Sequence, residues 1–76
     1  RFGKPPRERL FDFSEKTLGI VGLGAIGGTL CKKAQTLFKR VLATDPYIPE
    51  QRFAELGAIK ADLSTLLAES HVISLH

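Results

Sequence analysis

The sequence predicts an α/β fold, a Rossmann-type doubly wound parallel sheet cut to about four strands in the order 3-2-1-4. The first observation is an apolar, β-branched segment at residues 18–21 that enters a Gly22-x-Gly24-x-x-Gly27 turn and leaves it as a helix. The second is a strand-like segment further on that ends at Asp45. Strand and helix patterns then alternate to the end of the chain, which favours parallel strands joined by right-handed crossovers.

The glycine turn carries the strongest chemical signal. In a strand-to-helix turn of this spacing the first glycine allows the tight turn, the second lets the backbone approach a pyrophosphate, and the third lets the helix pack close to the strand. The free N–H groups and positive end of the helix then favour an anion. The motif therefore predicts a dinucleotide site, and the competing interpretation is a βαβ unit whose glycines serve only packing.

The segments on either side agree with the dinucleotide interpretation. After the turn, apolar residues recur at helical spacing and predict one face packed on the sheet. Residues 40–44 read as the second strand and deliver Asp45 at its carboxyl end, close to the roughly 20-residue interval at which an acid meets the adenosine ribose hydroxyls. The apolar helical face consists of Ile26, Leu30, Ala34, Leu37 and Phe38.

Two more helices and two more strands complete the expected sheet. The second helix is predicted to begin near Pro49, which suits a first helical position, and to stop at Gly57. A short third strand follows at residues 58–61. Asp62 is expected to cap a third helix, and residues 71–76 form the fourth strand. The residues of that third helix expected to face the sheet are Leu63, Leu66 and Leu67.

This strand order puts the ligand crevice outside the carboxyl ends of the first and fourth strands, where the order reverses. The glycine turn and residues 74–76 are therefore expected to line the same cleft. The fourth strand is left as an edge with apolar Val72, Ile73 and Leu75, which predicts self-association of these residues by themselves.

Composition narrows the class of protein. Seventy-six residues make one domain, and a start without methionine and an end inside an apolar run indicate a piece of something longer. The net charge of +3 is carried by residues 1–9, so residues 1–16 are interpreted as a basic leader and linker and residues 17–76 as the partial nucleotide-binding domain. Neither nucleic-acid binding nor a membrane span is expected. The single Cys31 allows no internal disulfide and is assigned a half-buried packing role.

No catalytic or metal site is predicted. His71 sits at an expected helix-to-strand corner, where a solvated histidine is common, and His76 at the cleft edge is not assigned an acid–base role. The acidic residues Asp12, Glu15, Asp62 and Glu69 form no paired-carboxylate arrangement, and no histidine or cysteine cluster has metal-ligand spacing.

Four segments taken in order resemble the D-isomer-specific 2-hydroxyacid dehydrogenases, with the phosphoglycerate dehydrogenase branch nearest. These segments are residues 16–27, 43–47, 62–70 and 72–76. The resemblance implies that the full-length protein transfers hydride between NAD and a D-2-hydroxy acid or 2-keto acid, as a cytoplasmic homodimer. The family's catalytic arginine, glutamate and histidine lie downstream of this region, so these 76 residues alone are expected to be inactive.

The resemblance also assigns cofactor contacts. Gly22, Gly24 and Gly27 with the intervening Ala25 and Ile26 match the pyrophosphate loop, although Ala25 stands where many relatives have arginine. Asp45 matches the ribose acid and favours NAD over NADP. The other matched positions are Pro46 and Tyr47 on the adenine side and Ser74, Leu75 and His76 at the strand end that borders the cofactor.

Two rival functions remain open at this point. The C-terminal-binding corepressors share these motifs and use the dinucleotide mainly to control assembly, which would make this a non-catalytic binding module. A Rossmann domain for another adenosine ligand, such as S-adenosylmethionine, is the second rival, but its motif usually departs from a full GxGxxG.

Overall fold

The computed structural model describes residues 13–76, and its sheet has the predicted order. All three strand pairings are parallel, and the neighbours run β3-β2-β1-β4. Residues 1–12, most of the expected basic leader and linker, lie outside the described residues. The strands are β1 (Thr17–Val21), β2 (Arg40–Thr44), β3 (Ile59–Lys60) and β4 (Val72–Leu75).

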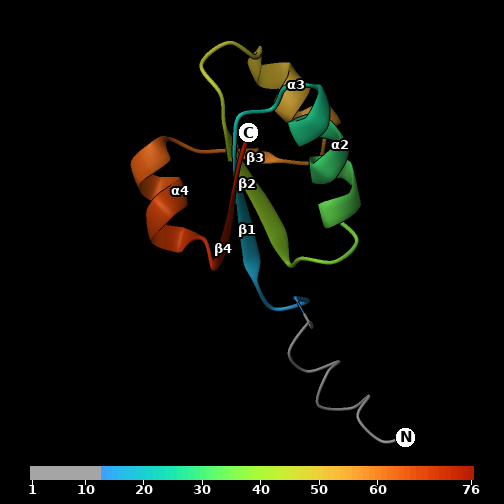
Figure 1. Ribbon diagram of the computed structural model, residues 1–76, viewed down its shortest axis with the longest axis vertical. Coiled ribbons are helices and arrows are strands. Elements are labelled where there is room, and N and C mark those ends of the chain that lie inside the picture. The colour runs from blue at the N-terminus through green and yellow to red at the C-terminus, as the bar shows by residue number, and fades with distance from the viewer. Residues whose placement is uncertain (1–12) are drawn as a thin grey trace, which may run out of the picture.

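Helices cover both faces of this sheet, as Figure 1 shows. Helices α2 (Ala25–Ala34) and α3 (Glu50–Glu55) lie on one side and α4 (Leu63–Glu69) lies on the other. The arrangement is the doubly wound one, because each parallel connection passes over a face of the sheet. Within residues 13–76 no helix is long and apolar enough to span a bilayer.

The core forms where α2 and α3 meet the two central strands. Leu18 and Ile20 of β1 and Val41 of β2 are at most 3% exposed. Phe53 is the largest fully buried side chain and brings α3 into the same cluster. The centre of the sheet is therefore apolar on both faces, as expected of central parallel strands.

The helix after the glycine turn buries a different face from the one predicted. Ile26 and Leu37 are 72% and 59% exposed, so the prediction that they face the sheet was wrong. Small residues allow α2 to approach the strands closely, and Leu37 lies in the turn beyond the helix end. Leu30 and Phe38 do pack against the core. The buried residues of α2 are Gly27, Gly28, Cys31 and Ala34.

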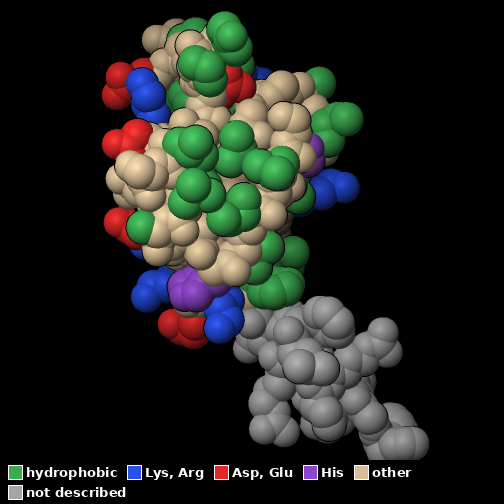
Figure 2. Space-filling model, turned by 60° about the vertical axis from the view of Figure 1, so that its left-hand side comes forward, with side chains coloured by type: hydrophobic (Ala, Val, Ile, Leu, Met, Phe, Trp, Pro, Cys, Tyr) green, Lys and Arg blue, Asp and Glu red, His purple; other side chains and the backbone are tan. Residues whose placement is uncertain are grey.

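Helix α4 also differs from the prediction. Only Leu66 is buried, whereas Leu63 and Leu67 are about half exposed. Leu66 lies over Gly19 of β1, where an added Cβ would stand 2.6 Å from its methyl group. A helix of seven residues offers room for one such contact, and its other two leucines point to the side. Figure 2 brings this α4 side forward and shows hydrophobic side chains gathered on it.

Smaller differences concern the ends of elements. Pro49 is the N-cap of α3 and not its first helical residue, β3 has only two residues, and β4 begins at Val72. Gly57 ends α3 with φ +77°, as its place after the helix predicts. The Asp62 cap is confirmed, since its carboxylate accepts from the Thr65 N–H at 2.8 Å. This backbone bond, together with side-chain hydrogen bonds from Thr65 and Ser64, lowers the pKa of Asp62.

The end of the sheet away from the glycine turn is closed by a polar network. The Thr17 N–H donates to Nδ1 of His71 at 3.0 Å, and the His71 N–H donates to the Thr17 carbonyl. Arg40 donates to the Thr17 hydroxyl and pairs with Glu69 at 2.8 Å. His71 is exposed at the corner before β4, as predicted, and it also joins this corner to β1.

Cys31 is fully buried, deeper than predicted, and its thiol donates to the Leu56 carbonyl at 3.2 Å. Burial raises its pKa, because the thiolate is poorly solvated there. We expect the folded full-length protein to react with iodoacetamide at Cys31 much more slowly than the urea-unfolded protein, which mass spectrometry of the peptide would show. The thiol of the unfolded protein ionises at a lower pH than the buried one. The folded protein should therefore lose stability as the pH rises into the alkaline range. Equal labelling rates in the two states would contradict this burial.

Candidate nucleotide-binding site

The glycine turn connects β1 to α2 at the carboxyl end of the sheet. Gly22 has φ +98°, a backbone conformation that residues other than glycine rarely adopt. Its N–H donates to the Thr44 carbonyl at 2.9 Å, and an added Cβ would lie 2.7 Å from the His76 carbonyl oxygen. The turn is thus held between the ends of β2 and β4, at the point where the strand order reverses.

Gly24 leaves open space at the start of α2. It is the N-cap residue, it makes no side-chain cap, and no acidic residue lies in the first helical turn. An added Cβ at Gly24 would meet nothing within 4 Å, and Ala25 and Ile26 beside it are exposed. An uncapped helix N-terminus with room above it suits a phosphate group, because N–H groups and the positive end of the helix dipole both face that space.

Gly27 serves packing. An added Cβ there would stand 2.2 Å from the Gly22 carbonyl oxygen, closer than any real side chain approaches. The first turn of α2 therefore presses on the turn that precedes it. Gly22 and Gly27 therefore have the turn and packing roles that their spacing predicts, and Gly24 leaves the space open that its predicted role requires.

Asp45 is half-buried at the carboxyl end of β2, and its carboxylate is anchored by two backbone donors. Oδ2 accepts from the Leu23 N–H at 2.7 Å and Oδ1 accepts from the Tyr47 N–H at 2.8 Å. An ionised carboxylate has about four acceptor positions, so two remain for a ligand. The bond to Leu23 couples the acid directly to the glycine turn, and the sequence carried no signal for it beyond the type of residue.

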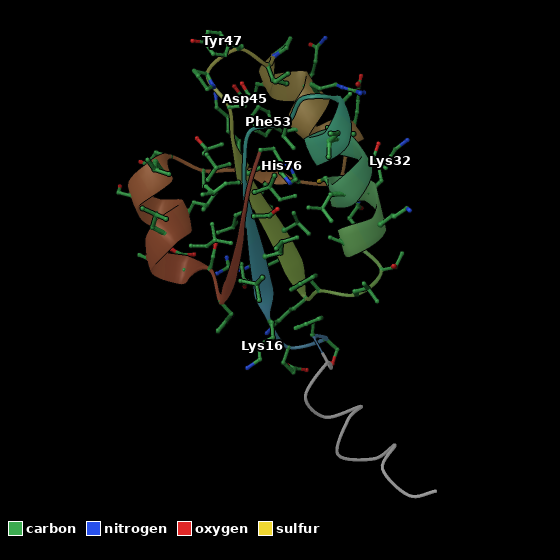
Figure 3. All side chains as sticks on the ribbon, in the orientation of Figure 1. Lys16, Lys32, Asp45, Tyr47, Phe53 and His76 are labelled. Carbon is green, nitrogen blue, oxygen red and sulfur yellow. The ribbon has the colours of Figure 1, made fainter. Side chains whose placement is uncertain are left out.

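The other residues expected to contact the cofactor lie in two groups, one after β2 and one at the end of β4. Tyr47 is 90% exposed and lies with Asp45 at the upper end of the molecule in Figure 3, and Pro46 is exposed as well. The His76 N–H donates to the Val21 carbonyl, and its ring lies 2.7 Å from the Ser74 hydroxyl. Leu75 is 74% exposed. The structure thus places His76 beside the glycine turn.

A cavity of about 440 Å³ adjoins Asp45 on the side away from β1. It lies between the loop after β2 and the loop after β3, and Lys60 and Asp62 line it together with Asp45. Lys60 belongs to none of the sequence motifs that predict a binding site. Its place at the end of β3 could have indicated that it lies near Asp45, because the carboxyl ends of parallel strands meet at one edge of the sheet. Within residues 13–76 no cluster of three or more His, Cys, Asp or Glu is placed to hold a metal ion.

The fold and this site define a Rossmann domain with the features of a dinucleotide-binding site. The chain belongs to the family described as the D-isomer specific 2-hydroxyacid dehydrogenase, NAD binding domain, which it matches over residues 1–76. The resemblance to this family is therefore confirmed, and NAD is the cofactor of the family domain.

Individual relatives carry two different activities. The chain is 41% identical over 61 residues to D-3-phosphoglycerate dehydrogenase of Archaeoglobus fulgidus, covering 80% of this chain and 12% of that protein. It is 44% identical over 66 residues to D-lactate dehydrogenase of Escherichia coli, covering 87% of this chain and 20% of that protein. The chain thus spans a fifth or less of these relatives.

Solved structures agree with the fold. The apo structure of the Escherichia coli D-lactate dehydrogenase matches with a TM-score of 0.76 at 44% identity, over 87% of this chain and 21% of that one. The D-lactate dehydrogenase of Aquifex aeolicus, solved with NAD and lactic acid, matches with a TM-score of 0.70 at 38% identity, over 80% and 18%.

Proposed function

We propose that these residues are the dinucleotide-binding part of a longer, NAD-dependent D-2-hydroxyacid dehydrogenase. The observation that carries the proposal is the open, uncapped start of α2 at Gly24, next to the Asp45 carboxylate. A pyrophosphate needs the first feature and a ribose diol the second, and the glycine turn brings them together. The domain boundary at residues 16 and 17 is part of the proposal.

Each site residue has a proposed role in holding NAD. Backbone N–H groups around Gly24, Ala25 and Ile26 bind the pyrophosphate, and Gly22 and Gly27 shape the turn. Asp45 accepts from the adenosine ribose hydroxyls and disfavours the 2′-phosphate of NADP. When bound, NAD supplies the hydride acceptor of the reaction. The remaining proposed contacts are Pro46 and Tyr47 on the adenine side and Ser74, Leu75 and His76 at the end of β4.

The proposed substrate is a small 2-hydroxy or 2-keto acid, because the family and the quoted relatives act on such compounds. Identities of 41% and 44% to relatives with different activities do not separate the two branches, so the phosphoglycerate branch stays a prediction. Homodimer formation and a cytoplasmic location also stay predictions.

The corepressor alternative is not favoured. The quoted relatives are dehydrogenases, and the family model that the chain matches is that of a dehydrogenase domain. The S-adenosylmethionine alternative is excluded by membership of the NAD-binding family.

We expect the full-length protein to oxidise NADH in the presence of a 2-keto acid and the 76 residues alone to show no turnover. Proton transfer and carboxylate binding need the catalytic arginine, glutamate and histidine that the resemblance places downstream of these residues. A spectrophotometric assay of both proteins against a panel of 2-keto acids measures this. Turnover by the 76 residues would show that the catalytic groups lie inside them, and a full-length protein that neither binds NAD nor turns over would refute the proposed function.

A further inference from the structure

The cavity beside Asp45 contains opposite charges whose balance bears on the choice between NAD and NADP. Two acidic residues, Asp45 and Asp62, and one basic residue, Lys60, line the same 440 Å³ space. The 2′-hydroxyl of an adenosine ribose bound by Asp45 is where NADP carries its additional phosphate. That phosphate would therefore be placed near this cavity.

Strand register puts Lys60 on the same side of the sheet as Asp45. Lys60 pairs with Ala43 of β2, and side chains two residues apart on a strand share a face. Asp45 stands two positions beyond Ala43, about 7 Å further along at roughly 3.3 Å per residue. Nζ of Lys60 lies 5.9 Å from the centroid of the Phe53 ring, which fixes the side chain on the α3 face. A four-carbon stem is long enough to turn toward Asp45 from there.

The ammonium group is available to an incoming anion. Lys60 is exposed, and the ion pairs within residues 13–76 join other residues. Asp62 is occupied, since its Oδ1 accepts from the Thr65 N–H and the Ser64 hydroxyl. The Asp45 carboxylate accepts from Leu23 and Tyr47, and its negative charge repels a phosphate. Lys60 is thus the one side chain lining the cavity whose charge attracts phosphate.

We propose that Lys60 is a second determinant of cofactor choice, a cation that attracts a 2′-phosphate and whose effect the negative charge of Asp45 outweighs. This inference rests on the proposed binding of NAD at the glycine turn. With Asp45 in place, the site favours NAD. Once its charge is removed, Lys60 provides the cation that NADP-binding sites ordinarily supply with arginine.

A double-mutant cycle tests the role of Lys60. Dissociation constants for NAD and NADP are measured by calorimetry on the full-length protein with Asp45→Asn, Lys60→Gln and both changes. We expect Asp45→Asn to improve NADP binding relative to NAD by about tenfold or more, and Lys60→Gln to reverse most of that gain. Lys60→Gln should change NAD affinity by less than about twofold. Lys32→Gln, a charge change on the outer side of α2 (Figure 3), is the matched control and should affect neither ratio.

A second probe keeps the test independent of how well the Asp45 variant folds. Lys60→Gln alone should weaken binding of 2′,5′-ADP about fivefold or more and leave 5′-AMP unchanged, because only the former has the 2′-phosphate. If Lys60→Gln binds 2′,5′-ADP and NADP as tightly as the unaltered protein does, and NAD still binds, this inference is overturned. Absence of NAD binding to the unaltered protein would instead overturn the proposed function, and this inference with it.

Discussion

Replacing Gly24 with valine is expected to abolish NAD binding by the full-length protein while leaving its fold in place. Gly24 has φ −61° and ψ −165°, close to the extended region that residues with a side chain adopt, and an added Cβ meets no atom within 4 Å. The same open space is where a pyrophosphate would approach the backbone. The branched side chain therefore competes with the ligand and not with the protein, and we expect affinity to fall by about 100-fold or more.

Calorimetric titration with NAD, together with circular dichroism of the same sample, measures this effect. Thr29→Val is a suitable control, because it introduces the same side chain at an exposed position one turn further along α2 and removes only a hydroxyl bond to the Ala25 carbonyl. A folded Gly24→Val protein with undiminished NAD affinity would show that the glycine turn is not the phosphate site.

The strand order and the grouping of the candidate site residues could be predicted from the sequence because both depend on local patterns. The glycine spacing, the apolar strands and Asp45 at the end of β2 are each visible as residue types at fixed distances along the chain. The rule that ligands bind where the strand order reverses then places His76 near Gly22, and the structure agrees. Consistency between several local signals is what made this part predictable.

The burial of individual leucines could not be predicted in the same way. Periodicity shows that a helix has an apolar face, but α2 lies so close to the sheet that glycine and alanine fill the contact and Ile26 remains exposed. Leu63 and Leu67 show the same limit in a helix too short to bury more than one leucine. The bond from Leu23 to Asp45 and the approach of Lys60 to the same cavity depend on strand register, which no single segment encodes.

Two adjacent glycines of α2 are expected to respond in opposite directions to the same substitution. An added Cβ at Gly27 would stand 2.2 Å from the Gly22 carbonyl oxygen, so backbone has to move, whereas at Gly28 the nearest atom is a Leu56 methyl at 3.6 Å, an ordinary contact. We expect Gly27→Ala to destabilise the protein by about 1–3 kcal/mol, the usual cost of overpacking. Gly28→Ala should stabilise it by up to about 1 kcal/mol, because alanine favours a helix interior over glycine.

Thermal unfolding of the two full-length variants, measured with and without NAD, separates packing from binding. Gly27→Ala should lower the melting temperature and also reduce the additional stabilisation by NAD, because the carbonyl that moves belongs to the glycine turn. Gly28→Ala should raise the melting temperature and keep the full effect of NAD, since ligand stabilisation depends only on affinity for the folded state. Equal shifts for both variants would mean that α2 does not press on Gly22, and the third glycine of the motif would then have no packing role distinct from that of its neighbour.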